Sequence, residues 1–164
     1  MPIVASDIKY KLSGGASNAD PLLSIGGAIS SADAPAGIFD DVGSAEAAAG
    51  DTEYRCVYVK NTHATLTYQG AKIWIQTQTP SADTAIAIAL GGEGLNGTAE
   101  TVANENTAPV GESFSAPSSF AGGLTIGDLA PGAYFPVWVR RTVNAAAAVY
   151  ADSFTLRVQC DTNP

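Results

Sequence analysis

The pattern closest to a cofactor-binding motif lies at residues 92–97, which read Gly-Glu-Gly-Leu-Asn-Gly. This glycine spacing matches the loop that binds the pyrophosphate of a dinucleotide, and it follows a predicted strand. That chemistry requires a helix beginning at the loop, because the helix N-terminus receives the phosphate charge. Residues 98–106 show no amphipathic helical pattern, and Pro109 follows them. The segment is therefore predicted to be a surface loop that binds no cofactor.

Nucleophilic catalysis needs a general base, and the chain offers a single histidine, His63. Cys56 lies in a predicted strand, and His63 lies in the turn that follows it, seven residues later. An extended chain would hold the two side chains roughly 20 Å apart, so they could meet only if the chain folded back. No Gly-x-Ser-x-Gly turn is present. The sequence predicts no catalytic residue, and His63 is interpreted as a surface residue in a turn.

Acidic residues at positions 40, 41, 51 and 53 are the candidate metal ligands. Asp40, Asp41, Asp51 and Glu53 can gather around Ca²⁺, which prefers several oxygen ligands. Their spacing lacks the Asp-x-Asp-x-Asp-Gly pattern of a dedicated calcium loop. A solvated loop is the preferred interpretation, so no metal site is predicted.

The two cysteines, Cys56 and Cys160, are too few for a four-cysteine zinc site or a disulfide-rich scaffold. The N-terminus has no basic and apolar signal pattern, so folding in a host cytoplasm is expected. Thiols stay reduced there, which favours two free cysteines over a disulfide. Both residues lie in strand-like segments, so a bridge stays open as the second alternative.

Composition excludes several functional classes. The 164-residue chain is 46% hydrophobic and 15% charged, which is not typical of a disordered polyelectrolyte. Its net charge of −8, with only eight basic residues, makes it a poor binder of nucleic acid. No apolar run approaches the length of a membrane span. The length fits one domain, two at most.

Charges are segregated along the chain. No basic residue lies between Lys11 and Arg55 or between Lys72 and Arg140, although acidic residues are frequent in both intervals. The simple interpretation is that the acids keep the loops soluble. The alternative is an acidic rim around a basic strand face that is left for a partner.

The tryptophans and their basic neighbours are the candidate partner-binding residues. Trp74 and Trp138 each lie in the strand register opposite to the Ile or Val residues of the same strand. Such a residue belongs either to a second core under a covering loop or to an exposed anchor, since Trp and Arg are enriched at interfaces. Arg140 and Arg141 point to opposite faces of their strand, so at most one reaches a partner and the other needs an internal acid or a sheet edge. The candidate site therefore comprises Trp138, Arg140, Trp74 and Arg141.

Short strands separated by turn signals predict an all-β fold, which is a single antiparallel β-sandwich or jelly-roll domain. Residues 1–53 are expected to form an extended, loop-rich N-terminal segment that packs on, or is exchanged with, neighbouring copies. Residues 54–164 are expected to form the sandwich core. The predicted strands are 8–13, 22–25 as an edge strand, 54–60, 65–68, 71–77, 84–90, 134–143 and 153–161. A helical turn is predicted at 44–50 with Ser44 as its N-cap, a bulge at 69–70, and loops at 91–112 and 144–150.

Four strings extend the interpretation beyond fold class, and they span nearly the whole chain in order: Lys11–Asn18, Ile38–Val42, Gly50–Asn61 and Val137–Val143. They resemble a family of small virion proteins of tailed bacteriophages. The resemblance implies a non-enzymatic structural protein of the particle, most like a capsid decoration (cement) protein on the capsid exterior. Its implied partners are the major capsid protein and copies of itself, often in a trimer, with no cofactor, nucleic acid or membrane. The alternative is a tail or head-fibre module that binds a host-surface glycan through Trp74, Trp138 and the 91–112 loop.

Overall fold

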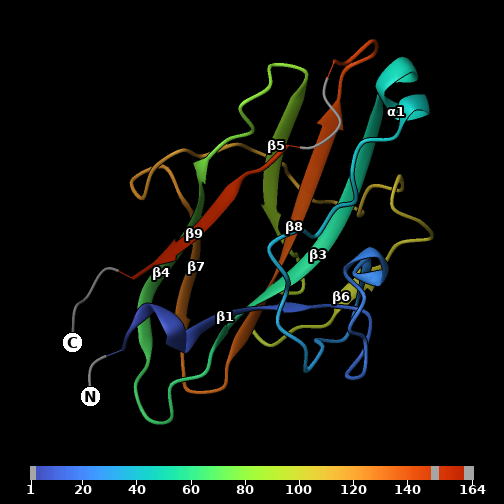
Figure 1. Ribbon diagram of the computed structural model, residues 1–164. Helices are drawn as coiled ribbons and strands as arrows, with labels where there is room; N and C mark the ends of the chain where they lie inside the picture. The colour runs from blue at the N-terminus through green and yellow to red at the C-terminus, as the bar shows by residue number, and fades with distance from the viewer. Residues whose placement is uncertain (1–2, 149–151, 161–164) are drawn as a thin grey trace.

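Dense β-branched and aromatic residues after residue 50 produce the long strands of the molecule. A computed structural model describes residues 3–148 and 152–160 and contains two main antiparallel sheets (Figure 1). The large sheet has the order β1-β3-β8-β5, with bounds Ile8–Leu12, Asp51–Asn61, Tyr134–Val143 and Thr84–Leu90. The small sheet has the order β7-β4-β9, with bounds Leu124–Leu129, Tyr68–Thr77 and Thr155–Gln159.

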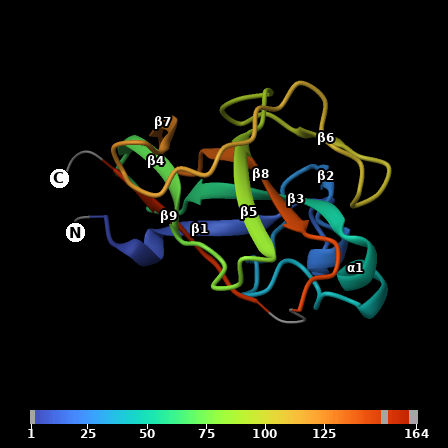
Figure 2. The ribbon, with the colours of Figure 1, turned by 90° about the horizontal axis from the view of Figure 1, so that it is seen from above.

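Shorter elements complete the chain. A two-stranded pair joins β2 (Gly26–Gly27) to β6 (Ala99–Thr101). Two 3-10 turns cover Ala5–Asp7 and Pro21–Leu23, and the helix α1 covers Ser44–Ala49. Seen from above, the small sheet lies at one end of the molecule, and β2, β6 and α1 lie at the other (Figure 2).

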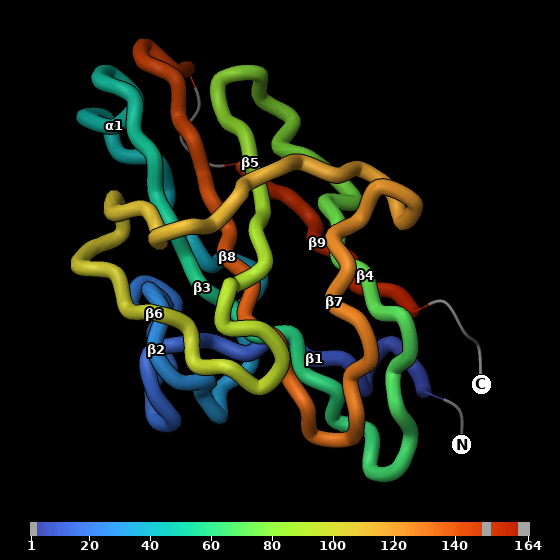
Figure 3. The backbone as a smooth tube through the Cα atoms, turned by 180° about the vertical axis from the view of Figure 1, so that it is seen from behind, coloured from blue at the N-terminus to red at the C-terminus, as the bar shows by residue number. Residues whose placement is uncertain are grey.

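The large sheet is covered on both sides. Its inner side packs against the small sheet through an aliphatic core that includes Val57, Ile73, Ile88 and Val139, each no more than 1% exposed. Its outer side carries a second core, which includes Tyr58 and Trp138. The chain from 91 to 123 crosses this outer side (Figure 3). The predicted antiparallel β-sandwich is confirmed.

The β2–β6 pair holds together the two segments that cover the outer side. Gly26 has φ +99, and a Cβ at this position would lie 1.7 Å from the carbonyl oxygen of Glu100, so only glycine fits there. The Tyr58 hydroxyl donates to the Gly27 carbonyl at 2.6 Å and accepts from the Ala99 amide at 2.9 Å. Burial raises the pKa of Tyr58 to about 12. A side chain of the large sheet is thus fastened to both covering segments.

Two outer edges of the large sheet are covered by the chain itself. Along β1, the Leu12 amide donates to the carbonyl of Ala32, and the Ala34 amide donates to the carbonyl of Tyr10. Along β5, the Gln78 side chain binds both the amide and the carbonyl of Ile86. By contrast, β9 pairs only with β4 and is an edge strand of the small sheet. Covering an edge prevents pairing with strands of other chains. The edge of β9 therefore differs from those of β1 and β5, because it can still pair with an added strand.

Most predicted strands occur where the pattern placed them. The strands at 84–90 and 134–143 match β5 and β8, and the bulge at 69–70 is confirmed by a register shift between Tyr68 and Ala71. The predicted strand 8–13 corresponds to β1, and 54–60 lies within β3. The strand predicted at 153–161 corresponds to β9, and its last residue lies outside the described residues, as does the end of the predicted 144–150 connection.

Three local predictions need correction. The edge strand predicted at 22–25 is wrong, because Pro21 starts a 3-10 turn there and the pairing strand is β2. The helical turn forms, but its N-cap is Gly43, not Ser44, and the Gly43 amide is bound by Glu46 at 2.6 Å. The 91–112 loop contains the short strand β6. In the structure the N-terminal segment packs on its own chain, since β1 pairs with β3 and the Cys56 amide donates to the carbonyl of Ser24.

Candidate functional site

Trp138 lies in the second core and is 0% exposed. It is surrounded there by buried residues that include Cys56 and Ala89, under the covering segments. Its indole N–H has no acceptor among the described residues. The interpretation of Trp138 as a second-core residue is confirmed, and its assignment as a partner-binding anchor is wrong, because no part of the ring reaches the surface.

Arg140 shares the outer side of the large sheet with Trp138. It is half-buried, and its guanidinium lies 5.1 Å from the centre of the Phe114 ring. Phe114 in turn meets Tyr54 edge-to-face at 5.4 Å. No carboxylate lies within ion-pair distance of Arg140 in the described part of the chain. The arginine therefore supports the covering loop and keeps an unpaired charge.

Arg141 points to the opposite side of the strand and is 7% exposed. Its Nε donates to Oε2 of Glu53 at 2.6 Å, and its Nη1 donates to the carbonyl of Asp40 at 2.5 Å. Glu53 lies directly across from it in the register of β3 and β8. The expectation that one arginine of the pair needs an internal acid is confirmed, and Arg141 is not available to a partner.

A second buried arginine, Arg55, escaped the sequence interpretation. It is 0% exposed, its Nε donates to the carbonyl of Ile38 at 3.1 Å, and its Nη2 binds Glu105 at 2.5 Å. The Phe39 ring centre lies 5.3 Å from the guanidinium of Arg55 and 4.9 Å from that of Arg141. Its position in the strand was the available signal, because alternation puts Arg55 on the same face of β3 as Glu53 and Val57. An arginine on a core-facing position needs an acidic partner.

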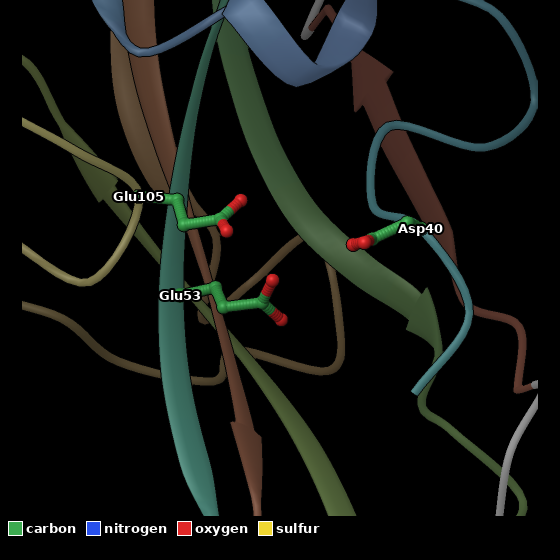
Figure 4. A group of neighbouring side chains, drawn as sticks. All are labelled: Asp40, Glu53 and Glu105. Atoms are coloured by element: carbon green, nitrogen blue, oxygen red, sulfur yellow. The ribbon is translucent and has the colours of Figure 1, made fainter. Parts of the chain in front are cut away.

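These contacts revise the calcium hypothesis for this region. Asp40, Glu53 and Glu105 each offer one oxygen within 4.8 Å of the others, and their side chains converge from three segments (Figure 4). Arg141 binds Asp40 and Glu53, and Arg55 binds Glu105. Asp41 belongs to neither of the two carboxylate clusters found among the described residues. Guanidinium groups therefore supply the positive charge beside Asp40, Glu53 and Glu105.

The outer face of the small sheet holds the remaining candidate, Trp74. Trp74 is 6% exposed, and Phe120 packs edge-to-face on its ring at 5.7 Å. The Lys72 ammonium lies 5.1 Å from the centre of the Phe120 ring, and the Arg157 guanidinium lies 5.9 Å from the Trp74 ring. We call these four residues, with Gln76, the basic face. Trp74 supports the face from below, so it is a positioning residue and presents no open ring.

An apolar groove lies beside the edge strand β9 and is lined by core-facing residues of that strand, such as Leu156. The groove has a volume of about 350 Å³ and is bordered by Tyr10, Pro35, Val57 and Leu156. None of the described residues that line it is acidic. Burial raises the pKa of Tyr10, so this hydroxyl stays neutral and adds no negative charge. None of the residues of the basic face lines this groove, and the two features share only the edge strand β9.

The remaining chemical candidates have structural roles. Cys56 and Cys160 are unbridged, and burial raises the pKa of the Cys56 thiol. His63 Nδ1 accepts the amides of Thr65 and Leu66 at 3.1 and 3.0 Å, so the histidine shapes its own turn. The 92–97 segment is a loop without a helix, as predicted.

Among the described residues, no helix has the length and apolar character needed to cross a bilayer. Comparisons with protein-family models, with curated proteins and with solved structures gave no match for this chain. The assignment of function therefore rests on the residues themselves, and the region that stands out is the basic face.

Proposed function

We propose that this chain is a non-enzymatic structural protein of a tailed-phage particle, which decorates the outer capsid shell by binding major capsid subunits. The observation that carries the proposal is the basic face. The protein as a whole is acidic, yet two cations without carboxylate partners among the described residues, Lys72 and Arg157, lie together there. The resemblance of four strings to phage virion proteins gives the particle context.

The cation inventory supports a binding role for this face. Of eight basic residues, Arg55 and Arg141 are neutralised in the interior, and two lysines share Asp33. Four cations have no carboxylate within 4.0 Å among the described residues, namely Lys60, Lys72, Arg140 and Arg157. Two of these, Lys72 and Arg157, lie together on the small sheet. A protein with sixteen acids has enough carboxylates to pair them, so their isolation favours an external acidic partner.

The aromatic support makes the face ready to bind. Contacts with Phe120 and Trp74 restrict the long side chains of Lys72 and Arg157 before any partner arrives. Restricting such side chains in advance lowers the entropy lost on association. The outward positions of β4 and β9 add Gln76, Thr155 and Gln159, which can donate and accept hydrogen bonds. We infer a shell surface of complementary negative charge as the partner.

The edge strand β9 offers a second contact for a shell subunit. The borders of the large sheet, at β1 and β5, are covered by the chain's own loops, whereas β9, one of the two edge strands of the small sheet, lies next to the apolar groove. An extended segment of a shell subunit can pair with such an edge and fill such a groove. The glycan-binding alternative relied on exposed indoles, and both rings are buried.

The direct test adds purified protein to shells of the encoding phage that were assembled without it. The proposal expects saturable binding at a fixed number of sites per shell, measured by sedimentation, and extra density on the outer surface in images of the particles. Failure to bind any head form would overturn the proposal. Antibody labelling confined to the tail would overturn it in favour of a tail module.

A further inference from the structure

A second carboxylate group lies beside the arginine network and shares one residue with it. Glu46 on α1, Asp51 at the start of β3 and Glu53 each offer one oxygen within 4.8 Å of the others. The group around Asp40 and Glu105 contains two guanidinium groups, but no Lys or Arg lies within 4.0 Å of Glu46 or Asp51 in the described residues. Only Glu53 has a cationic partner, Arg141. Three negative charges therefore meet one positive charge.

Apart from the clustering of the three acids, Glu53 itself has a carboxylate oxygen that is buried and unpartnered among the described residues. This residue is 1% exposed, and its Oε2 accepts from Arg141, but its Oε1 is buried without any hydrogen-bond partner. A buried carboxylate oxygen without a partner is costly, so such an atom points to a missing ligand. The carboxylate lacks part of the compensation that its burial requires.

The other two carboxylates are held in place by their own contacts. Oε2 of Glu46 accepts the Gly43 amide at 2.6 Å, and Oδ1 of Asp51 accepts from Thr52 and Asn106 at 2.8 and 2.7 Å. Each residue thereby keeps a second oxygen for which no hydrogen bond is formed with the described residues. All three carboxylates present one oriented oxygen and one available oxygen.

We propose that Glu46, Asp51 and Glu53 bind one Ca²⁺ ion at the junction of α1 and β3. Oxygens up to 4.8 Å apart fit a common Ca²⁺, since Ca–O distances are about 2.3–2.6 Å and two ligands on opposite sides then span this separation. Carboxylates without His or Cys select a hard cation, and Ca²⁺ tolerates an irregular ligand set better than Mg²⁺. Glu46 and Asp51 are half-exposed, so the ion has access and water completes its coordination.

The site shares Asp51 and Glu53 with the calcium alternative weighed from the sequence, and it does not include Asp40 and Asp41. It recruits Glu46 from α1 instead, and Asp51 links it to Asn106 of the 91–112 loop. A bound ion would fasten α1, β3 and this loop at one point. The inference does not depend on the proposed function, because it concerns only the stability and ion affinity of the isolated chain.

The test titrates CaCl₂ into the full-length protein, previously treated with a chelator, by calorimetry and thermal unfolding. We expect one ion per chain, a higher melting temperature with Ca²⁺ than with chelator, and a smaller rise with the same concentration of MgCl₂. No heat and no thermal shift at millimolar Ca²⁺ would overturn the site. Equal responses to Mg²⁺ and Ca²⁺ would overturn the calcium assignment.

Matched variants locate the site. Glu46→Gln and Asp51→Asn are expected to weaken Ca²⁺ binding at least about tenfold, whereas Asp41→Asn, a nearby exposed acid outside the group, leaves it unchanged. Unchanged affinity in both ligand variants would contradict the proposal. A readout on the unmutated protein guards against variants that fail to fold. Amide resonances of 51–53 and α1 should shift on Ca²⁺ addition while those of β9 stay fixed, and the reverse pattern would overturn the assignment.

Discussion

The interior of the large sheet and the outer face of the small sheet use basic residues in opposite ways. Arg55 and Arg141 are buried, bonded to carboxylates and carbonyls, and stacked near one phenylalanine ring. Lys72 and Arg157 lie on aromatic rings at the surface and have no carboxylate partner among the described residues. Proximity of Arg to Trp in the sequence therefore does not identify a binding site, because the partner of each charge decides its role.

The interior arginines also explain how the covering segments stay in place. Arg141 bonds to Asp40, and Arg55 bonds to Ile38 and Glu105, so two distant segments converge on β3 and β8. A buried ion pair contributes little net stability compared with a well-packed apolar pair, but breaking one partner is costly. We therefore assign the interior arginines to structural specificity and the surface cations to recognition.

The largest expected effect comes from breaking the interior network. Arg141→Ala should lower the free energy of unfolding by about 3–5 kcal/mol, because Glu53 is left buried without its cation. Denaturant unfolding measures the change. The double variant Arg141→Leu with Glu53→Leu should recover most of the loss, since no unpaired buried charge remains and the Asp40 carboxylate, which loses Arg141, is exposed to water. A double variant as unstable as the single one would show that the network does more than neutralise charge.

Trp138→Phe sharpens the distinction between core and surface. The smaller ring should cost about 1–2 kcal/mol of stability through the space it leaves in the second core. Because Trp138 is 0% exposed, shell binding by the folded variant should equal that of the unmutated protein. Sedimentation with shells measures this binding. If the variant is fully folded but binds shells more weakly, Trp138 belongs to the interface after all.

Phe120→Ala tests the aromatic support of the basic face. Phe120 is half-buried and packs on Trp74 and Lys72, so its loss should cost about 1 kcal/mol of stability. Shell affinity should fall several-fold more than this stability loss explains, because the cations lose their restraint. Affinity that stays unchanged would mean that the rings only complete a core.

The smallest effect is expected at the paired surface lysines. The hydrogen bond from Lys11 lowers the pKa of Asp33 below its ordinary value. A lowered folded-state pKa stabilises the protein above the unfolded-state pKa, and this contribution disappears as the pH falls below about 4. Asp33→Asn should therefore cost about 0.5 kcal/mol or less at neutral pH and nothing at low pH. Unfolding curves at both pH values measure the difference, and a pH-independent loss would exclude the ion pair as its cause.

Local patterns predicted the strands but not the partners of the buried charges. Alternating residues identified β5 and β8 with their observed bounds, and the strand parity of Arg140 and Arg141 predicted their opposite faces. The network depends on contacts between residues far apart in the chain, such as Glu53 and Arg141, which are 88 positions apart. Unless the pairing and register of β3 and β8 are already known, no local sequence pattern predicts that these two residues meet. The burial of Trp138 likewise depends on loops whose own sequences carry no periodic signal.

In the proposed function, the cations of the small sheet, and not the arginines beside Trp138, form the docking surface. The most direct measurement compares shell binding by a Lys72→Glu and Arg157→Glu double variant with binding by Lys60→Glu, which reverses an unpaired cation on the large sheet. The account predicts that the double variant folds normally but loses at least about tenfold in shell affinity, whereas Lys60→Glu binds as before. Equal binding by the two variants would contradict the claim.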